Sequence, residues 1–264
     1  MKIILKLRDI VRWCIRTLCA DLLEDISRIQ QYNFSTFAMH QKAFPQFKGI
    51  YTGKDVVVVA CGPTAKDYKP IEGAIHIGVN HAIYLKNVQL DYLFLMDAYK
   101  ARKDNEMPDY NNYRKGKCVK FYGITSFPMN NTTYVPSESD VIEAGAYRYR
   151  TDNLVAMRIE NNGQFLYDIS TQPLTDCGSV VFSALQFALW TNPKRLYLVG
   201  CDCTATGHFN TSGNDKTGLP SDMRETYTKL KHFAQAFYPQ TEIISINPVG
   251  LKGLFTDFYQ QGNA

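Results

Sequence analysis

The sequence lacks several patterns that would identify a common class of site or protein. It contains no stretch of 18 uncharged apolar residues, so no segment is expected to span a membrane. It has neither G-x-x-x-x-G-K-[ST] nor G-x-G-x-x-G, which excludes a P-loop and the dinucleotide fingerprint. Its seven cysteines show no C-x-x-C or similar metal-ligand spacing, and Cys201 and Cys203 form the only close pair. Internal repeats and low-complexity segments are also missing.

What is present fits one large α/β domain with a substantial core. The chain has 264 residues and is 45% hydrophobic, which is enough to bury such a core. A formal net charge of +4 is mild and predicts no nucleic-acid partner. Four cysteines lie in or beside apolar segments and are predicted to be small buried hydrophobic residues in a reducing cytoplasm: Cys61, Cys118, Cys177 and Cys201.

The first 30 residues predict a basic amphipathic helix, and residues 31–53 a connector. Apolar side chains recur at helical spacing on one face, with basic side chains among them. The apolar positions are Ile3, Leu7, Ile10, Cys14, Leu18 and Leu22, and the basic ones are Lys2, Lys6, Arg8, Arg12 and Arg16. Such a helix suits the surface of an anionic membrane, where residues 1–24 would dock. The same pattern also fits a helix that packs on the domain or on a second subunit.

Residues 54–258 alternate short apolar strands with helices, which predicts a single α/β domain with a doubly wound, mainly parallel, Rossmann-like sheet. Four consecutive valines at 56–59 show no polar alternation and indicate a central strand that is buried on both faces. Further strands are expected at 74–79, 92–96, 116–123, 195–201 and 241–247, and helices at 178–192 and 222–238. Residues 124–173 are rich in Asn, Tyr and Ser and are expected to form an insertion or lid rather than a layer of the sheet.

Polar or glycine residues follow five of the predicted strands. They are Gly62-Pro63-Thr64, Asn80, Asp97, Gly200 through Asp202, and Asn247. A glycine turn that leads from a strand into a helix is a place where open α/β sheets bind anions, because free N–H groups and the helix dipole face the ligand. Each of these residues, considered alone, could also be an ordinary polar loop residue with no ligand. Five that converge on one edge of a sheet predict a site of nucleotide size.

The order of these motifs resembles a known family. The blocks "ACGPTAKDY", "GVNHA", "DCGSVVFSALQFALW" and "LYLVGCD" are similar to those of the bacterial sialyltransferases of glycosyltransferase family 42. They are also similar to the related superfamily that contains archaeal 6-hydroxymethylpterin pyrophosphokinase and flagellin-modifying nonulosonate transferases. The resemblance covers roughly residues 47–255.

The resemblance implies a role for most of the strand-end residues. Gly62, Pro63 and Thr64 would lie against the phosphate and ribose of a nucleotide-sugar donor, and Asn80 would hydrogen-bond the nucleotide. Gly178 and Ser179 would meet the phosphate at the start of their helix, and Asp202 would sit near the ribose or base. Asp97 and Asn247 are added as donor-side candidates because of their place at strand ends.

A histidine in the loop after the "LYLVGCD" strand serves as general base in sialyltransferases of this family. His208 is the only histidine in the corresponding loop here. Inverting glycosyl transfer requires a base that is active near neutral pH to take the proton of the acceptor hydroxyl, and imidazole fits that need. A surface histidine with no catalytic role fits the pattern as well. His81, next to Asn80, is the second choice for a contact to nucleotide or phosphate.

No D-x-D pair occurs, although many transferases that use nucleotide diphosphate sugars hold a divalent ion with one. A nucleotide monophosphate leaving group carries a single phosphate and needs less neutralisation. We therefore expect a metal-independent enzyme without a cofactor that uses a CMP-linked donor. Lysines and helix N-termini can also neutralise a diphosphate, so a UDP-sugar remains an alternative.

Three functions are compatible with these features. The first is a cytoplasmic, inverting glycosyltransferase that adds a sialic-acid-like sugar to a surface glycan such as lipopolysaccharide or capsule. It would be docked on the inner membrane and could form a homo-oligomer. The second is a pterin-type pyrophosphokinase that uses ATP and Mg²⁺, with Asp97 and Asp202 as metal ligands. The third is a non-enzymatic nucleotide-binding or assembly protein.

Overall fold

The computed structural model describes residues 2–96, 113–124, 138–151, 164–175, 177–204, 207–209 and 223–260. Its centre is an eight-stranded sheet in the order β5-β4-β3-β2-β1-β6-β7-β8. All seven strand pairs are parallel, as expected for a doubly wound α/β domain. The strands are β1 Asp55–Val59, β2 Ile75–Val79, β3 Tyr92–Leu95, β4 Val119–Ile124, β5 Ala146–Arg150, β6 Arg195–Val199, β7 Glu242–Ile246 and β8 Thr256–Phe258.

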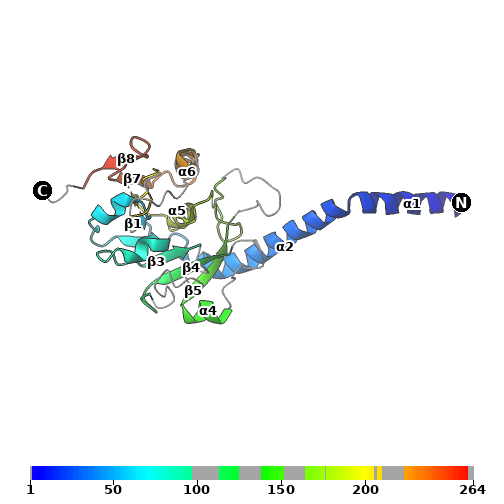
Figure 1. The fold of residues 1–264 in the computed structure, drawn as a ribbon, viewed down its shortest axis with the longest axis horizontal. Coiled ribbons are helices and arrows are strands. Elements are labelled where there is room, and N and C mark those ends of the chain that lie inside the picture. The colour runs from blue at the N-terminus through cyan, green and yellow to red at the C-terminus, as the bar shows by residue number, and fades with distance from the viewer. Residues whose placement is uncertain are drawn as a thin grey trace.

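Helices pack on the sheet and on one another, except for α1 and the first part of α2, which project from the domain (Figure 1). The α-helices are α1 Lys2–Leu18, α2 Ala20–Ala43, α4 Glu138–Glu143, α5 Val180–Trp190 and α6 Met223–Phe237, and the 3-10 helices are η1 Pro45–Phe47, η2 Pro63–Asp67 and η3 Asn80–Tyr84. Every residue of α5 is buried, because β1, β2 and β3 lie on one side of this helix and α6 on another. Phe182 of α5 packs on Tyr227 of α6, with 4.9 Å between ring centroids.

The valine strand β1 is the middle of the molecule, as the sequence predicts. Val56 and Val58 point into one apolar core, and Val57 and Val59 point into the other, on the opposite face of the sheet. All four side chains are fully buried. At the start of the strand, Arg195 of β6 donates two hydrogen bonds to the Asp55 carboxylate, at 2.8 and 2.6 Å, which fixes the register of the two neighbouring strands.

Three segments differ from the expectation. The predicted connector 31–53 is helical in its first part, because α2 continues to Ala43 and packs on β5. The predicted insertion 124–173 contains β5, which extends the sheet beside β4 and is therefore part of the sheet layer. Its sequence AYRYR is too polar to be recognised as a buried strand, because it lies at the sheet edge. Strand β8 is also a member of the sheet that the sequence does not predict.

Cysteines follow the expectation with one exception. Cys61, Cys118 and Cys201 are buried free thiols, whereas Cys177 is half-buried because it lies in the turn before α5.

The N-terminal helix α1 projects away from the domain on the end of α2 (Figure 1). Its main contacts are with α2, so packing on the domain, one of the arrangements that the sequence left open, is not seen for the described residues. Several of its apolar side chains are exposed: Leu7, Ile10, Val11, Trp13, Ile15 and Leu18. Within the described ranges, no helix has the length and apolar character needed to cross a bilayer.

A buried histidine, His40, joins α2 to the sheet edge. The backbone N–H of Arg150 donates to His40 Nε2 at 2.8 Å, so Nδ1 carries the proton and donates to the carbonyl oxygen of Ile169, also at 2.8 Å. The ring is fully buried, and this burial lowers the pKa of His40 to about 4. The neutral imidazole thus joins α2 to two segments that lie 110 and 129 residues further along the chain.

We expect His40 to make the fold sensitive to acid. Above pH 6.5 the residue is neutral in both states and contributes no pH dependence. Between pH 6.5 and about 4 the unfolded chain binds a proton at this residue and the folded chain does not. The free energy of unfolding therefore decreases by about 3 kcal/mol as the pH is lowered through this range. Urea unfolding of the wild type and of His40→Gln across this range should show the steeper loss in the wild type. His232→Gln, at an exposed position on α6, is the control and should retain the wild-type slope. Equal slopes for the wild type and His40→Gln would contradict the role of His40.

Candidate functional site

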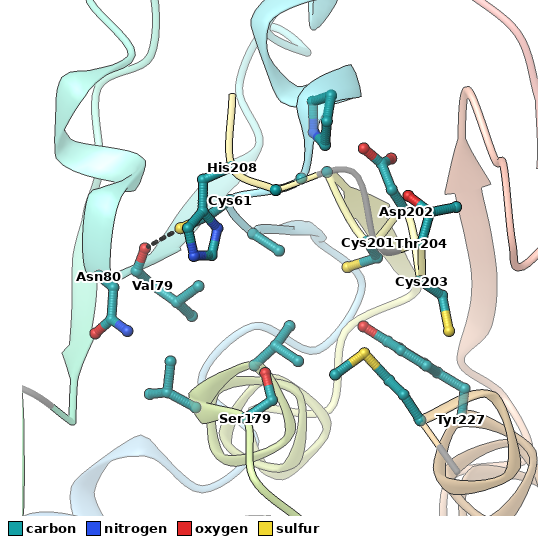
Figure 2. Close-up of a pocket in the computed structure, with 18 residues that line it drawn as sticks. Cys61, Val79, Asn80, Ser179, Cys201, Asp202, Cys203, Thr204, His208 and Tyr227 are labelled. Atoms are coloured by element: carbon teal, nitrogen blue, oxygen red, sulfur yellow. Dashed lines mark hydrogen bonds between the residues drawn. The ribbon is translucent and has the colours of Figure 1, made fainter. Parts of the chain in front are cut away.

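A pocket of about 110 Å³ lies at the carboxyl ends of β1, β2 and β6 and at the start of α5 (Figure 2). The chain runs from β1 outward to β2 in one direction and from β6 outward to β7 in the other, so the pocket is at the switch point of the sheet. Six of the residues predicted to form a site line it: Gly62, Pro63, Asn80, Ser179, Asp202 and His208.

Two glycines allow the ends of β1 and β6 to approach closely. The N–H of Gly62 donates to the carbonyl oxygen of Gly200 at 2.8 Å. A Cβ on Gly62 would lie 2.4 Å from that oxygen and 2.6 Å from Asp202 Oδ2. Gly200 has a φ of +64°, and a Cβ there would lie 2.7 Å from the carbonyl oxygen of Ala60. Any larger side chain at either position would push the two strand ends apart.

Asp202 is held between these strand ends by Thr64. The backbone N–H of Thr64 donates to Asp202 Oδ2 at 2.9 Å, and the Thr64 hydroxyl donates to Oδ1. Burial raises the pKa of Asp202, and the two hydrogen bonds from Thr64 offset part of that rise. Both carboxylate oxygens are therefore engaged by the protein. Thr64 is not itself in the pocket lining but stands behind Asp202.

Asn80 supplies an amide at the end of β2. Its backbone has a φ of +41°, which asparagine tolerates better than most residues. The side-chain oxygen accepts a hydrogen bond of 3.3 Å from the N–H of Met96, just past β3. Asn80 is the first residue of η3, and Val79 occupies the N-cap position before it. The side-chain oxygen thus links two strand ends, and the amide nitrogen remains as a donor at the pocket.

The start of α5 forms the floor of the pocket in Figure 2. Ser179 has extended backbone angles at the N-cap position, and its hydroxyl does not cap the helix. Val180 and Val181, the first residues of α5, also line the pocket, and their N–H groups belong to the positive end of the helix. Gly178 is exposed, has a φ of +72° and precedes this lining. Ser179 and the first turn of α5 can therefore meet an anion.

His208 enters the pocket from the loop after β6. The N–H of the next residue, Phe209, donates to the carbonyl oxygen of Cys61 at 2.8 Å and so ties this loop to the end of β1. The ring of His208 lies 5.5 Å from the ring of His81, centroid to centroid, and both residues are half-buried. Figure 2 shows His208 and Asn80 on one side of the pocket, with Asp202 and Thr204 on the other. An imidazole thus faces the space above the start of α5.

One predicted residue, Asp97, lies outside the described residues. Another, Asn247, does not line the pocket. Asn247 directly follows β7. Its side-chain oxygen accepts a hydrogen bond of 3.0 Å from the N–H of Gln260, and its own N–H donates to the carbonyl oxygen of Phe258. Asn247 therefore connects β7 to the segment after β8, and its predicted contact with a donor has no support in its position.

The pocket also contains residues to which the sequence analysis assigned no role in binding or catalysis. Three cysteines, Cys61, Cys201 and Cys203, line it together with Met223 and Tyr227 of α6. Burial raises the pKa of both Cys61 and Cys201 to about 12, so these thiols stay protonated. Amphipathic spacing identified α6 as a helix but could not show which end reaches the site. Among the described residues, no group of three or more His, Cys, Asp and Glu side chains is placed to hold a metal.

The chain matches no family model and no curated protein. Among solved structures, it is similar to the sialyltransferase CstII from Campylobacter jejuni in complex with the substrate analogue CMP-3FNeuAc, at 12% identity and a TM-score of 0.42 over 80% of this chain and 89% of that chain. A complex of the same enzyme with a trisaccharide acceptor and CMP gives 13% identity and a TM-score of 0.43 over 80% and 88%.

The MAf glycosyltransferase from Magnetospirillum magneticum AMB-1 is similar at 14% identity, with a TM-score of 0.45 over 85% of this chain and 38% of that chain. These structures are glycosyltransferases, as the motif resemblance leads one to expect. At these identities and TM-scores the similarity carries no inference about substrate or mechanism, which must rest on the residues of the pocket.

Proposed function

We propose that this protein is a glycosyltransferase that moves a sialic-acid-like sugar from a nucleotide donor, CMP-linked in the first instance, to a hydroxyl of a bacterial surface glycan. The observation that carries the proposal is the position of His208 at the switch-point pocket, opposite Asp202 and above the first turn of α5. A base and an anion-binding helix end thus share one pocket. This is the pairing that transfer from a sugar phosphate requires.

The reaction begins with His208 as general base. Its unprotonated ring nitrogen takes the proton of the acceptor hydroxyl while the acceptor oxygen attacks the anomeric carbon of the donor sugar. The bond from that carbon to the phosphate oxygen breaks, and the nucleotide leaves with the bonding electron pair. Attack from the face opposite the phosphate inverts the anomeric configuration. The hydrogen bond from Phe209 to Cys61 supports this role because it fixes the base relative to the end of β1.

Negative charge that develops on the leaving phosphate is met by fixed dipoles. The N–H groups at the start of α5 and the Ser179 hydroxyl are available on the floor of the pocket. The Asn80 amide lies at the end of β2, where it would donate to the nucleotide. A volume of about 110 Å³ is smaller than typical ligand pockets of about 300–1,000 Å³, so only part of the donor would be enclosed by the described residues.

The choice of a CMP-linked donor without metal follows from the absence of a D-x-D pair in the sequence. The alternative pyrophosphokinase would need carboxylates for Mg²⁺. Asp202 is the one carboxylate among the described residues that line the pocket, and both of its oxygens already accept hydrogen bonds from Thr64. The pocket geometry therefore favours the glycosyltransferase.

We expect CMP to stabilise the protein in the presence of EDTA. Ligand at a hundredfold its dissociation constant adds about 2.7 kcal/mol to the free energy of unfolding. A thermal-shift panel of CMP, UDP, GDP and ATP, each with EDTA or with Mg²⁺, measures this effect. Stabilisation by ATP only with Mg²⁺ would move the assignment to the pyrophosphokinase. A shift with UDP but not with CMP would replace the proposed donor by a UDP-sugar.

His208→Ala should reduce turnover by about 10²–10⁴-fold, the usual size of a general-base contribution. Affinity for CMP should change little, because the base contacts the acceptor proton and not the nucleotide. The wild-type rate should fall on the acidic side of the pH profile, and the variant should lose that limb. His232→Ala, at an exposed position on α6, is the matched control. Turnover near the wild-type value in His208→Ala would exclude His208 as the base.

We also propose that α1 docks this cytoplasmic enzyme on the inner membrane. Several of its apolar side chains are exposed to solvent, and its polar face carries Arg8, Arg12 and Arg16. A helix of this kind lies in the interface of an anionic membrane, with each basic residue worth about 1 kcal/mol near the surface. Membrane attachment would bring the pocket to a lipid-linked glycan acceptor.

The double variant Arg12→Glu/Arg16→Glu should abolish salt-sensitive binding to phosphatidylserine vesicles and leave the folded domain intact. Lys86→Glu/Lys252→Glu changes the net charge equally at two exposed positions of the domain, and should still bind. Vesicle co-sedimentation at low and high salt provides the measurement. Equal binding by the two double variants would show that α1 does not dock on the membrane through its basic residues.

A further inference from the structure

Helix α2 carries a second apolar surface, which is exposed and which at Phe34 borders a groove shared with α4 and β5. Leu23, Ile26, Phe34 and Phe37 are 52, 42, 76 and 47% exposed, respectively. Successive residues of a helix are about 100° apart, so these four side chains and Gln30 fall within an arc of roughly 80°. The buried residues Tyr32, Thr36, His40 and Ala43 occupy a different arc, which faces the sheet edge. The exposed set is called the outer stripe of α2.

The spacing of the outer stripe is symmetric about its centre. From Leu23 the steps are three, four, four and three positions, through Ile26, Gln30 and Phe34 to Phe37. An antiparallel copy of the helix, related by a two-fold axis at Gln30, would place Leu23 opposite Phe37 and Ile26 opposite Phe34. A surface that matches itself under a two-fold axis is what an isologous dimer interface requires.

Gln30 at the centre agrees with this arrangement. A glutamine amide has both a donor and an acceptor, so two symmetry-related Gln30 side chains can hydrogen-bond each other in the middle of an apolar contact. The two glutamines would fix the register, as a single polar residue does in other helix pairs. On each side of the centre, one aromatic and one aliphatic side chain would meet.

We propose that α2 pairs with α2 of a second copy of this chain, antiparallel and centred on Gln30, through the outer stripe. An anionic membrane is a poorer occupant, because residues 20–39 contain three acidic residues and one basic residue, which gives this part of α2 a net negative charge. The projection of α2 from the domain leaves its N-terminal half open to such a partner (Figure 1). The pairing does not depend on the proposed chemistry.

The interface is small. A phenylalanine side chain buries about 150–250 Å², and each copy contributes two, so the contact belongs to the low end of specific interfaces. The dimer should therefore dissociate on dilution. Sedimentation velocity of the full chain over a hundredfold range of concentration, without lipid, measures the monomer–dimer equilibrium.

Phe34→Glu should raise the dissociation constant of the dimer at least tenfold, because two carboxylates would be buried against Ile26 of the other copy. The control is Phe258→Glu on β8, at the opposite edge of the sheet from β5, where the native side chain is 48% exposed. This control should dimerise like the wild type. A chain that is monomeric at all concentrations, or a Phe34→Glu variant that dimerises normally, would overturn the proposal.

Cross-linking tests the direction of the pair. In a background in which Cys14 and Cys19 are replaced by serine, oxidation of a mixture of Ile26→Cys and Phe34→Cys chains should give the mixed disulfide dimer. Each variant oxidised by itself should stay largely uncross-linked, because positions 26 and 34 face each other and not themselves. Efficient homodimer disulfides from each variant would indicate a parallel pair and reject the antiparallel arrangement.

Discussion

The close contact between the ends of β1 and β6 is the constraint on which the site depends. Gly62 and Gly200 have no side chains to separate the two strands, and Asp202 is fastened to Thr64 across the gap. A carboxylate that is nearly buried is costly unless its oxygens accept hydrogen bonds, and here both do. The contact therefore holds the strand ends at a fixed separation, and the pocket opens directly beside it.

Hydrogen bonds from backbone N–H groups fix the functional side chains relative to the strand ends. Asn80 is held by Met96, so its amide is fixed relative to two neighbouring strands. His208 stands in a loop, but Phe209 anchors that loop to Cys61. The imidazole and the amide thus take their places from β1, β2 and β3, whose residues are almost all buried. Such support is what a base needs if it is to be oriented before the acceptor arrives.

Much of this arrangement was readable from the sequence, and the failures have physical causes. The valine run of β1 and the glycine turn after it were recognisable because a central parallel strand is apolar on both faces and a close approach requires glycine. Strand β5 was missed since an edge strand is polar on its open side. The helical part of residues 31–53 was missed because its inward face contains His40 and Thr36, which look polar in sequence but are buried. Asn247 is a strand-end residue whose side-chain oxygen accepts a hydrogen bond from the chain itself, a partner that the sequence pattern does not reveal.

The sheet order also governs how the chain can fold as it is made. β1 is the central strand, yet its partner β6 lies 140 residues further along, as the pairing of Asp55 with Arg195 shows. At a synthesis rate of 5–20 residues per second, roughly 7 to 28 s pass before that partner emerges. Throughout this interval one edge of β1 presents unpaired N–H and C=O groups and bare valines. A nascent chain in this condition is prone to aggregate, so the protein should depend on chaperones during synthesis more than its size would indicate.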